Sequence, residues 1–169
     1  MKKIAEYQLD EELSPKRVSF CAAQSLTELP ALIKPRNSHF VLFLALDASK
    51  LDPVGIYATA EQLLDLGMVW ACVWGADCEK VHDIIDQAKW KKNPNESDDN
   101  VVMTTWHDKE PLSEAVWFFL NCAFAVPAYE KTCDDWIAAV IGNPKWEKKV
   151  RSKLATERRK ALKEQRGRK

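Results

Sequence analysis

Cysteine, histidine and aspartate are the residue types in this 169-residue chain whose spacing could support nucleophilic or metal chemistry. Cys78 lies at the predicted start of a helix, where the helix dipole stabilises a thiolate, and His107 could act as its general base. Cys78 and His82 are four residues apart and share one face of that helix. His107, Asp47 or Asp108 could complete a tetrahedral metal set. A small cysteine- or metal-dependent hydrolase or transferase is therefore one hypothesis. Because no CxxC or HExxH pair is present, we predict no resident metal.

Nucleotide-binding loops are absent from the sequence. The chain has five glycines, no GxGxxG and no GxxxxGK[ST], and known phosphate cradles need such glycine-rich turns. We therefore predict no cofactor. A helix N-terminus could still hold an anion while Trp74 or Trp106 stacks on a base, so nucleotide binding by another geometry stays open.

Polar and aromatic side chains follow the ends of the predicted strands. Ligands of open parallel sheets bind beyond the carboxyl ends of the strands. The leading hypothesis is a non-enzymatic binding module that recognises a partner protein or a small ligand at this edge. The residues predicted to bind are Asp47, Trp74, Asp77, Thr105, Trp106, His107, Glu110 and Asn143. A plainer interpretation of Asp77, Asp108 and Asn143 is that they cap helices and form turns.

Four short, nearly continuous apolar runs are typical of strands that are buried on both faces: 40–46, 69–74, 101–106 and 136–142. Helical patterns alternate with them. The alternation predicts an α/β three-layer sandwich with a mainly parallel four- or five-stranded sheet, Rossmann- or flavodoxin-like. The order 2-1-3-4 for these four strands is the first expectation, and another parallel order is the second.

The helices between the strands have recognisable starts. Asp52-Pro53 opens a helix that ends at Gly67, and Asp77 is expected to cap a helix over 78–90. Pro111 opens a third helix and Asn143-Pro144 a fourth, whereas 91–100 is a polar loop. In the N-terminal part, 4–9 could be an edge strand and 25–33 a short helix.

Three parts of the chain are distinguished by composition. We expect an N-terminal extension (1–39) that packs on the core, an α/β domain (40–154) and a basic helical tail (155–169). The third helix, around Trp117 and Phe118, is apolar on nearly all sides. Either the N-terminal segment covers it or a second copy of the chain does, as a homodimer.

The net charge of zero hides an asymmetry. Residues 145–169 contain 12 Lys/Arg and 3 Glu, so this part carries +9 and the rest −9. Such a tail could bind anions, and a nucleic-acid-associated protein is the third hypothesis. The candidate residues are Arg158, Arg159, Lys160, Lys163, Arg166, Arg168 and Lys169.

Cysteine usage and hydropathy indicate the compartment. The five cysteines form no CxxC pair, and Cys21, Cys72 and Cys122 lie among apolar residues, as reduced thiols do. The N-terminus turns polar at once, and no apolar run reaches the ~20 residues of a membrane span. The sequence therefore predicts a cytoplasmic protein without a membrane span.

Three strings resemble a family of small bacterial proteins of unassigned function. They are WGADCEKVHDIID (74–86), VVMTTWHDKEPLSEAVWFFLNCAF (101–124) and WIAAVIGNPKW (136–146). The resemblance covers about residues 40–150 and leaves out the basic tail. It implies a bacterial, cytosolic, stand-alone domain and carries over no catalytic residue.

Overall fold

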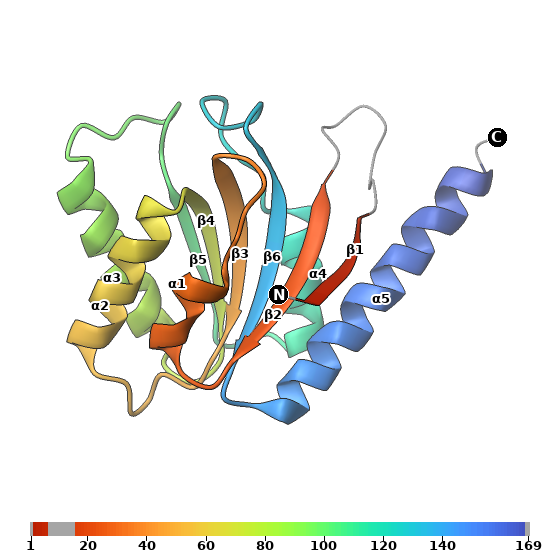
Figure 1. Ribbon diagram of the computed structural model, residues 1–169, viewed down its shortest axis with the longest axis horizontal. Helices are drawn as coiled ribbons and strands as arrows, with labels where there is room; N and C mark the ends of the chain where they lie inside the picture. The colour runs from red at the N-terminus through yellow and green to blue at the C-terminus, as the bar shows by residue number, and fades with distance from the viewer. Residues whose placement is uncertain (1, 7–15, 168–169) are drawn as a thin grey trace.

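The computed structural model describes the backbone of residues 2–6 and 16–167 and the side chains of 16–157, 159 and 160. The strands are β1 (Lys2–Glu6), β2 (Arg17–Ala23), β3 (His39–Ala45), β4 (Met68–Trp74), β5 (Met103–His107) and β6 (Cys133–Ile141). The helices are the 3-10 turn η1 (Leu26–Glu28), α1 (Leu29–Leu32), α2 (Pro53–Asp65), α3 (Cys78–Lys92), α4 (Leu112–Asn121) and α5 (Pro144–Gly167). The predicted alternation of strands and helices is confirmed (Figure 1).

All six strands form one sheet in the order β1-β2-β6-β3-β4-β5. Strands β2, β6, β3, β4 and β5 are parallel, and only β1 is antiparallel to its neighbour. The predicted order 2-1-3-4 is therefore wrong, since those four strands lie in the order 3-2-1-4. Helices α2 and α3 cover the same face, so β5 is added outside β4, and α4 then carries the chain across the other face to β6.

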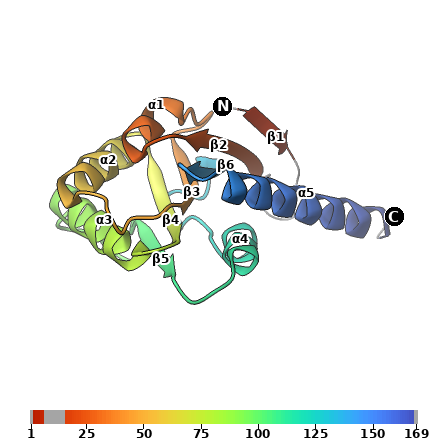
Figure 2. The same ribbon diagram turned by 90° about the horizontal axis from the view of Figure 1, so that it is seen from below.

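Two helical layers enclose the sheet, as Figure 2 shows end-on. Helices α1, α2 and α3 cover one side, hereafter the α3 face, and α4 and α5 cover the other, the α4 face. Side chains of β3 alternate between them: Phe40 and Leu42 point to the α3 face, whereas Val41 and Phe43 point to the α4 face. The Phe43 and Phe119 rings lie 5.6 Å apart. This two-sided burial explains why the central strands are apolar at every position.

Strand β2 was not expected from the sequence. It pairs with β6 over its whole length, from Arg17 beside Asp135 to Ala23 beside Ile141. The Arg17 guanidinium forms salt bridges with Asp134 at 3.2 Å and Asp135 at 2.7 Å, which fixes the start of the pair. Residues 17–23 are thus part of the sheet itself. The edge strand expected at 4–9 is β1, although residues 7–9 lie outside the described part.

Local signals set most helix starts. The Asp52 side chain accepts a hydrogen bond from the Gly55 amide at the start of α2, and Gly67 follows the end of α2 with φ +94°. The expected cap at Asp77 is wrong. Asp77 has the left-handed φ of 55°, and its side chain makes no capping hydrogen bond to α3. The loop expected at 91–100 begins at Asn93, because α3 continues to Lys92.

Helix α4 is covered on its apolar side by the sheet and by α5. Its buried side, which includes Phe119, packs on the sheet, and α5 lies beside it. Lys16 donates to the Leu120 carbonyl at 3.1 Å, and its ammonium lies 3.8 Å from the centre of the Phe124 ring. Trp117 remains 48% exposed. Within the described residues, no helix is long and apolar enough to cross a bilayer.

Candidate functional site

The carboxyl ends of the parallel strands meet at one edge, the lower edge in Figure 1 and the side nearest the viewer in Figure 2. The loops after β3 and β4 are joined there, because Leu46 N donates to Trp74 O and Ala48 N donates to Ala76 O. Gly75 permits this contact. It has φ +125°, and a Cβ at this position would lie 2.0 Å from the Leu46 carbonyl oxygen. Gly75 thus allows the close contact between the loops after β3 and β4, and these loops carry some of the predicted site residues.

Four of the predicted residues form one cluster on the α4 face. The Trp74 indole donates to the Glu110 carbonyl at 2.9 Å, and the Glu110 carboxylate lies 3.7 Å from His107 Nδ1. His107 Nε2 lies 3.2 Å from the Thr105 hydroxyl, and the His107 ring is 4.8 Å from the Phe118 ring. The cluster fastens the loop between β5 and α4, residues 108–111. The polar groups of this cluster therefore mainly form hydrogen bonds and ion pairs with one another.

His107 is the buried centre of this cluster, with 5% exposure. Burial lowers its pKa below the ordinary 6.5, and the nearby Glu110 carboxylate opposes that shift only in part. The imidazole is therefore neutral at pH 7. A neutral ring between Thr105 and Phe118 is a packing element of the β5–α4 connection.

The α3 face at the same edge is open and acidic. A surface depression of about 710 Å³ lies between the starts of α2 and α3 and the end of β5. Four carboxylates line it together with one lysine. The lining residues are Pro53, Asp77, Cys78, Glu79, Lys80, Asp83, Ile84, Gln87 and Asp108. We call this surface the acidic hollow.

The charges of the acidic hollow are not balanced. The Lys80 ammonium is 3.7 Å from Asp77 and donates to the Ala48 carbonyl at 2.5 Å, so the lysine also serves the backbone. Glu79 and Asp108 form no salt bridge with any other residue in the described part of the chain. The net negative charge at this surface is therefore available to a cation.

Two aromatic rings lie near Asp83, one of the residues that line the hollow. Trp106 projects from the α3 face of β5, is 42% exposed, and lies 4.5 Å from the His82 ring. His82 Nδ1 is 3.0 Å from the carboxylate of Asp83, which lines the hollow. Of the predicted binding residues, Asp77 lines the hollow, and Trp106 is exposed on the same face of the sheet. Glu79, Lys80 and Asp83 were missed, although the i, i+4 spacing of Glu79 and Asp83 opposite the apolar stripe of α3 was a usable signal.

The geometry does not support the cysteine nucleophile. The Cys78 side chain is fully buried, with 0% exposure, and burial raises the pKa of its thiol. Nucleophilic cysteines are thiolates in accessible, electropositive surroundings. The His107 imidazole packs on the α4 face, whereas Cys78 belongs to the core of the α3 face. The sheet thus separates the proposed nucleophile from its proposed base.

The metal hypothesis has the same difficulty. His82 lies on the α3 face, with Asp83 and Asp86 as its acidic neighbours at 3.0 Å and 3.6 Å. His107 lies across the sheet. Among the residues whose side chains are described, no group of three His, Cys, Asp or Glu could hold a metal ion together.

Two further predicted residues have local structural roles. Asp47 accepts from the Ser49 amide at 3.0 Å and from its hydroxyl at 2.6 Å, and these hydrogen bonds lower the pKa of the carboxylate. The Asn143 side chain accepts from the amides of Lys145 and Trp146, both at 3.1 Å. Asp47 thus forms a turn, and Asn143 caps α5, as the plainer interpretation of Asn143 predicts.

Residues 18–157 match the model of a family described as a domain of unknown function (DUF7684). The chain belongs to this family. The match includes β2 to β6 and the first half of α5, and it confirms the resemblance to a family without an assigned activity. No curated protein matches the chain. The DUF7684 match assigns no role to any residue.

Two groups of basic residues lie in the C-terminal part of this DUF7684 chain, from Lys148 onward. Arg159 and Lys160 are exposed on α5. Arg159 lies 3.3 Å from the Thr156 hydroxyl, and Lys160 lies 3.1 Å from the Glu157 carboxylate. Arg158, Lys163 and Arg166 lie on α5, but their side chains are outside the described part, as are Arg168 and Lys169 altogether. A second group, not singled out from the sequence, lines a groove between α4 and the start of α5. The groove has a volume of about 560 Å³ and is lined by Pro111, Leu112, Ser113, Lys148, Lys149, Ser152, Lys153 and Thr156. We call it the basic groove.

Proposed function

We propose that this chain is a non-enzymatic binding module whose partner is a protein with a basic, extended segment. The segment would lie along β5 with its cationic side chains over the acidic hollow. The observation that carries this proposal is the lining of the hollow, four carboxylates against one lysine. Electrostatic complementarity of this kind selects partners and speeds their association.

The edge position of β5 supports an extended partner. β5 pairs with β4 only, so within the described residues its outer edge has no strand beside it. Its sequence Met103–His107 contains neither a proline nor a lysine, the residues that often protect an exposed edge. A peptide added as a further strand would place alternate side chains on the α3 face, next to Trp106. Lysine or arginine there would meet an indole and the carboxylates of Asp83 and Asp108.

An enzymatic role has less support than binding. The candidate catalytic residues Cys78 and His107 lie on opposite faces, and the thiol is buried. The hollow offers four carboxylates and one lysine, and the exposed Trp106 lies on the same face of the sheet, a combination that suits recognition of a cation.

We place this module in the cytoplasm, because all five cysteines are free thiols and four of them are buried. A homodimer through α4, around Trp117 and Phe118, is a separate proposal. Trp117 is exposed, whereas Phe118 is half-buried against His107. Sedimentation velocity tests it: the dimer proposal fails if the protein is monomeric at every concentration.

The partner proposal is tested by selecting peptides from a random phage-displayed library on the purified protein. We expect the enriched peptides to be basic. They should bind the triple variant Asp77→Asn, Asp83→Asn, Asp108→Asn about tenfold more weakly or worse, because the variant loses the charges that face the cations. Trp106→Ala should weaken the same peptides.

The matched control is Asp98→Asn, Asp99→Asn, Glu130→Gln, which removes three exposed carboxylates away from the hollow. It should bind the peptides as the parent chain does. Enrichment of acidic or apolar peptides, or equal losses in the two triple variants, would contradict the proposal.

A further inference from the structure

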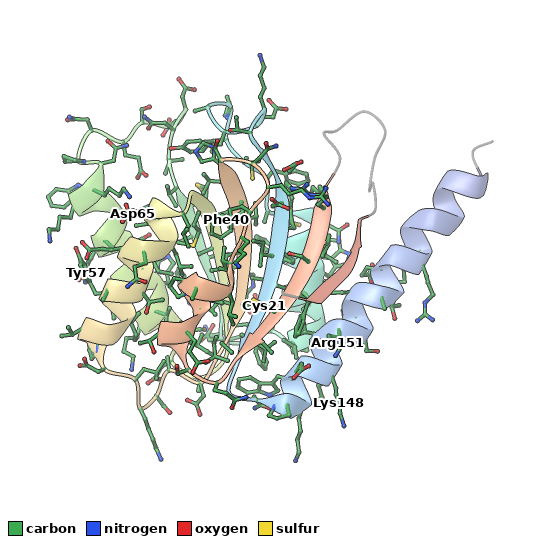
Figure 3. All side chains as sticks on the ribbon, in the orientation of Figure 1. Cys21, Phe40, Tyr57, Asp65, Lys148 and Arg151 are labelled. Atoms are coloured by element: carbon green, nitrogen blue, oxygen red, sulfur yellow. The ribbon has the colours of Figure 1, made fainter. Side chains whose placement is uncertain are left out.

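The basic groove carries a net charge of the opposite sign to that of the acidic hollow. Among the residues whose side chains are described, its lining contains Lys148, Lys149 and Lys153 and no acidic residue. Lys148 and Lys149 are exposed and form no salt bridge with another residue of the described part. Figure 3 labels Lys148 and Arg151 on the first turns of α5, at the end of the helix next to the sheet. The groove therefore presents uncompensated positive charge.

Lys153 is positioned by a buried carboxylate. Glu157 lies 2.9 Å from Lys153 and 3.1 Å from Lys160, and it is largely shielded from solvent. Lys145, Lys149 and Lys153 follow one another at intervals of four residues, a rise of about 6 Å each along the helix. The cations are thus arranged as a row along α5, which suits the successive phosphates of an extended polyanion.

An exposed indole lies on α4, one helical turn beyond a residue of the groove lining. Trp117 follows Ser113, a residue of the groove lining, by one helical turn, so the two side chains lie on the same side of α4. Trp117 is 48% exposed, whereas the other apolar side chains of α4 are buried or half-buried. Lysines on phosphates and an aromatic ring on a base are the two elements by which proteins bind single strands without sequence preference.

We propose that the basic groove binds single-stranded nucleic acid, with Lys148, Lys149 and Lys153 on phosphates and Trp117 stacked on a base. A paired base would not offer its face to the indole, which favours a single strand over a duplex. An acidic peptide would use the lysines but leave the indole without a role. Residues 145–169 carry 12 Lys/Arg against 3 Glu, which adds to the attraction of a polyanion.

The test is fluorescence anisotropy with a labelled oligo-dT of about 12 nucleotides, titrated with the full chain at several salt concentrations. We expect binding that weakens with salt. The variant Lys148→Gln, Lys149→Gln, Lys153→Gln should bind at least about tenfold more weakly, with the slope of log K against log salt reduced by about 2. Trp117→Ala should lose about tenfold, and Trp117→Phe should recover most of it.

Matched controls separate a specific groove from general charge. Lys34→Gln, Lys50→Gln, Lys131→Gln removes the same charge from exposed lysines outside the groove, and Trp90→Ala removes an indole that is 67% exposed on α3. Both should bind like the parent chain. The proposal is overturned if the oligonucleotide does not bind at low salt or if the two lysine triples lose equally. It is also overturned if polyglutamate or anionic vesicles bind more tightly than oligo-dT. The acidic-hollow variant should bind oligo-dT normally, so this proposal and the partner proposal can fail separately.

Discussion

The acidic hollow and the basic groove lie at the same edge of one sheet, on opposite faces, and they are built by the same short loop. Asp108 lines the hollow and Pro111 lines the groove, only three residues apart. Between them Glu110 is held by Trp74 and His107. The two surfaces differ in the sign of their charge, but the same internal cluster of Trp74, His107 and Glu110 holds both in place. Substitutions should therefore affect both surfaces, or one alone, according to which part they touch.

The largest effect is expected from Gly75→Ala. The new Cβ would stand 2.0 Å from the Leu46 carbonyl oxygen at a φ of +125°, so the β3 and β4 loops must separate. We expect a loss of about 3 kcal/mol or more in the free energy of unfolding, measured by urea denaturation. Gly55→Ala is the control, since a Cβ there meets nothing within 4 Å. Near-normal stability of Gly75→Ala would show that the loops are not tightly joined.

His107→Ala should be next in size. It removes a buried ring from between Thr105 and Phe118, and we expect a cost of about 2 kcal/mol. Because the cluster holds residues 108–111, ligand binding at both surfaces should weaken. If binding changes at only one surface, the loop at residues 108–111 does not couple the two surfaces, and the His107 cluster does not hold both of them in place.

The charge state of His107 makes a smaller, pH-dependent contribution to the free energy of unfolding. Burial lowers its pKa below 6.5, so as the pH falls through 6.5 the unfolded chain takes up a proton that the folded chain does not. Stability should therefore be full above pH 6.5 and decline as the pH falls toward the folded-state pKa. Urea denaturation of the parent chain and of His107→Gln from pH 7.5 to 5 isolates this contribution. A parallel pH dependence in both proteins would assign it to other groups, such as His39, whose pKa burial also lowers.

Asn143→Ala should affect the basic groove alone. The side chain caps α5 through the amides of Lys145 and Trp146, and loss of such a cap costs about 1 kcal/mol. Fraying of the first turn would displace Lys148 and Lys149, so oligonucleotide binding should fall while basic-peptide binding stays. Asn143→Ser keeps a capping oxygen and should restore both stability and binding.

The sheet was predictable where burial is complete. Strands β3, β4 and β6 are covered on both faces, so their apolar runs stand out, as at Phe40–Leu44. β2 carries Arg17 and Ser19 in its seven residues, and a strand with mixed polarity resembles a loop in sequence. The strand order depends on which face each helix covers, and no local pattern encodes that choice.

The candidate site was predicted by place rather than by residue. The rule that ligands bind beyond the carboxyl ends of strands indicated the edge at which both proposed surfaces lie, but it did not separate the two faces. Thr105 and Trp106 both lie at the end of the same strand, but adjacent strand residues point to opposite sides of the sheet. Asp77 was expected to be a cap, and its left-handed backbone conformation is a tertiary consequence of the turn after Gly75.

The smallest effect is expected from Asp77→Asn, and its smallness is informative. Asparagine tolerates the left-handed φ of 55° as aspartate does, and the 3.7 Å pair with Lys80 is exposed, so stability should change by less than about 0.5 kcal/mol. Basic-peptide binding should nevertheless weaken, because one of four carboxylates in the hollow is lost. A stability loss above about 1 kcal/mol would mean that the Asp77 carboxylate serves the fold. Its place in the hollow would then have a structural cause, as the His107 cluster on the opposite face already has.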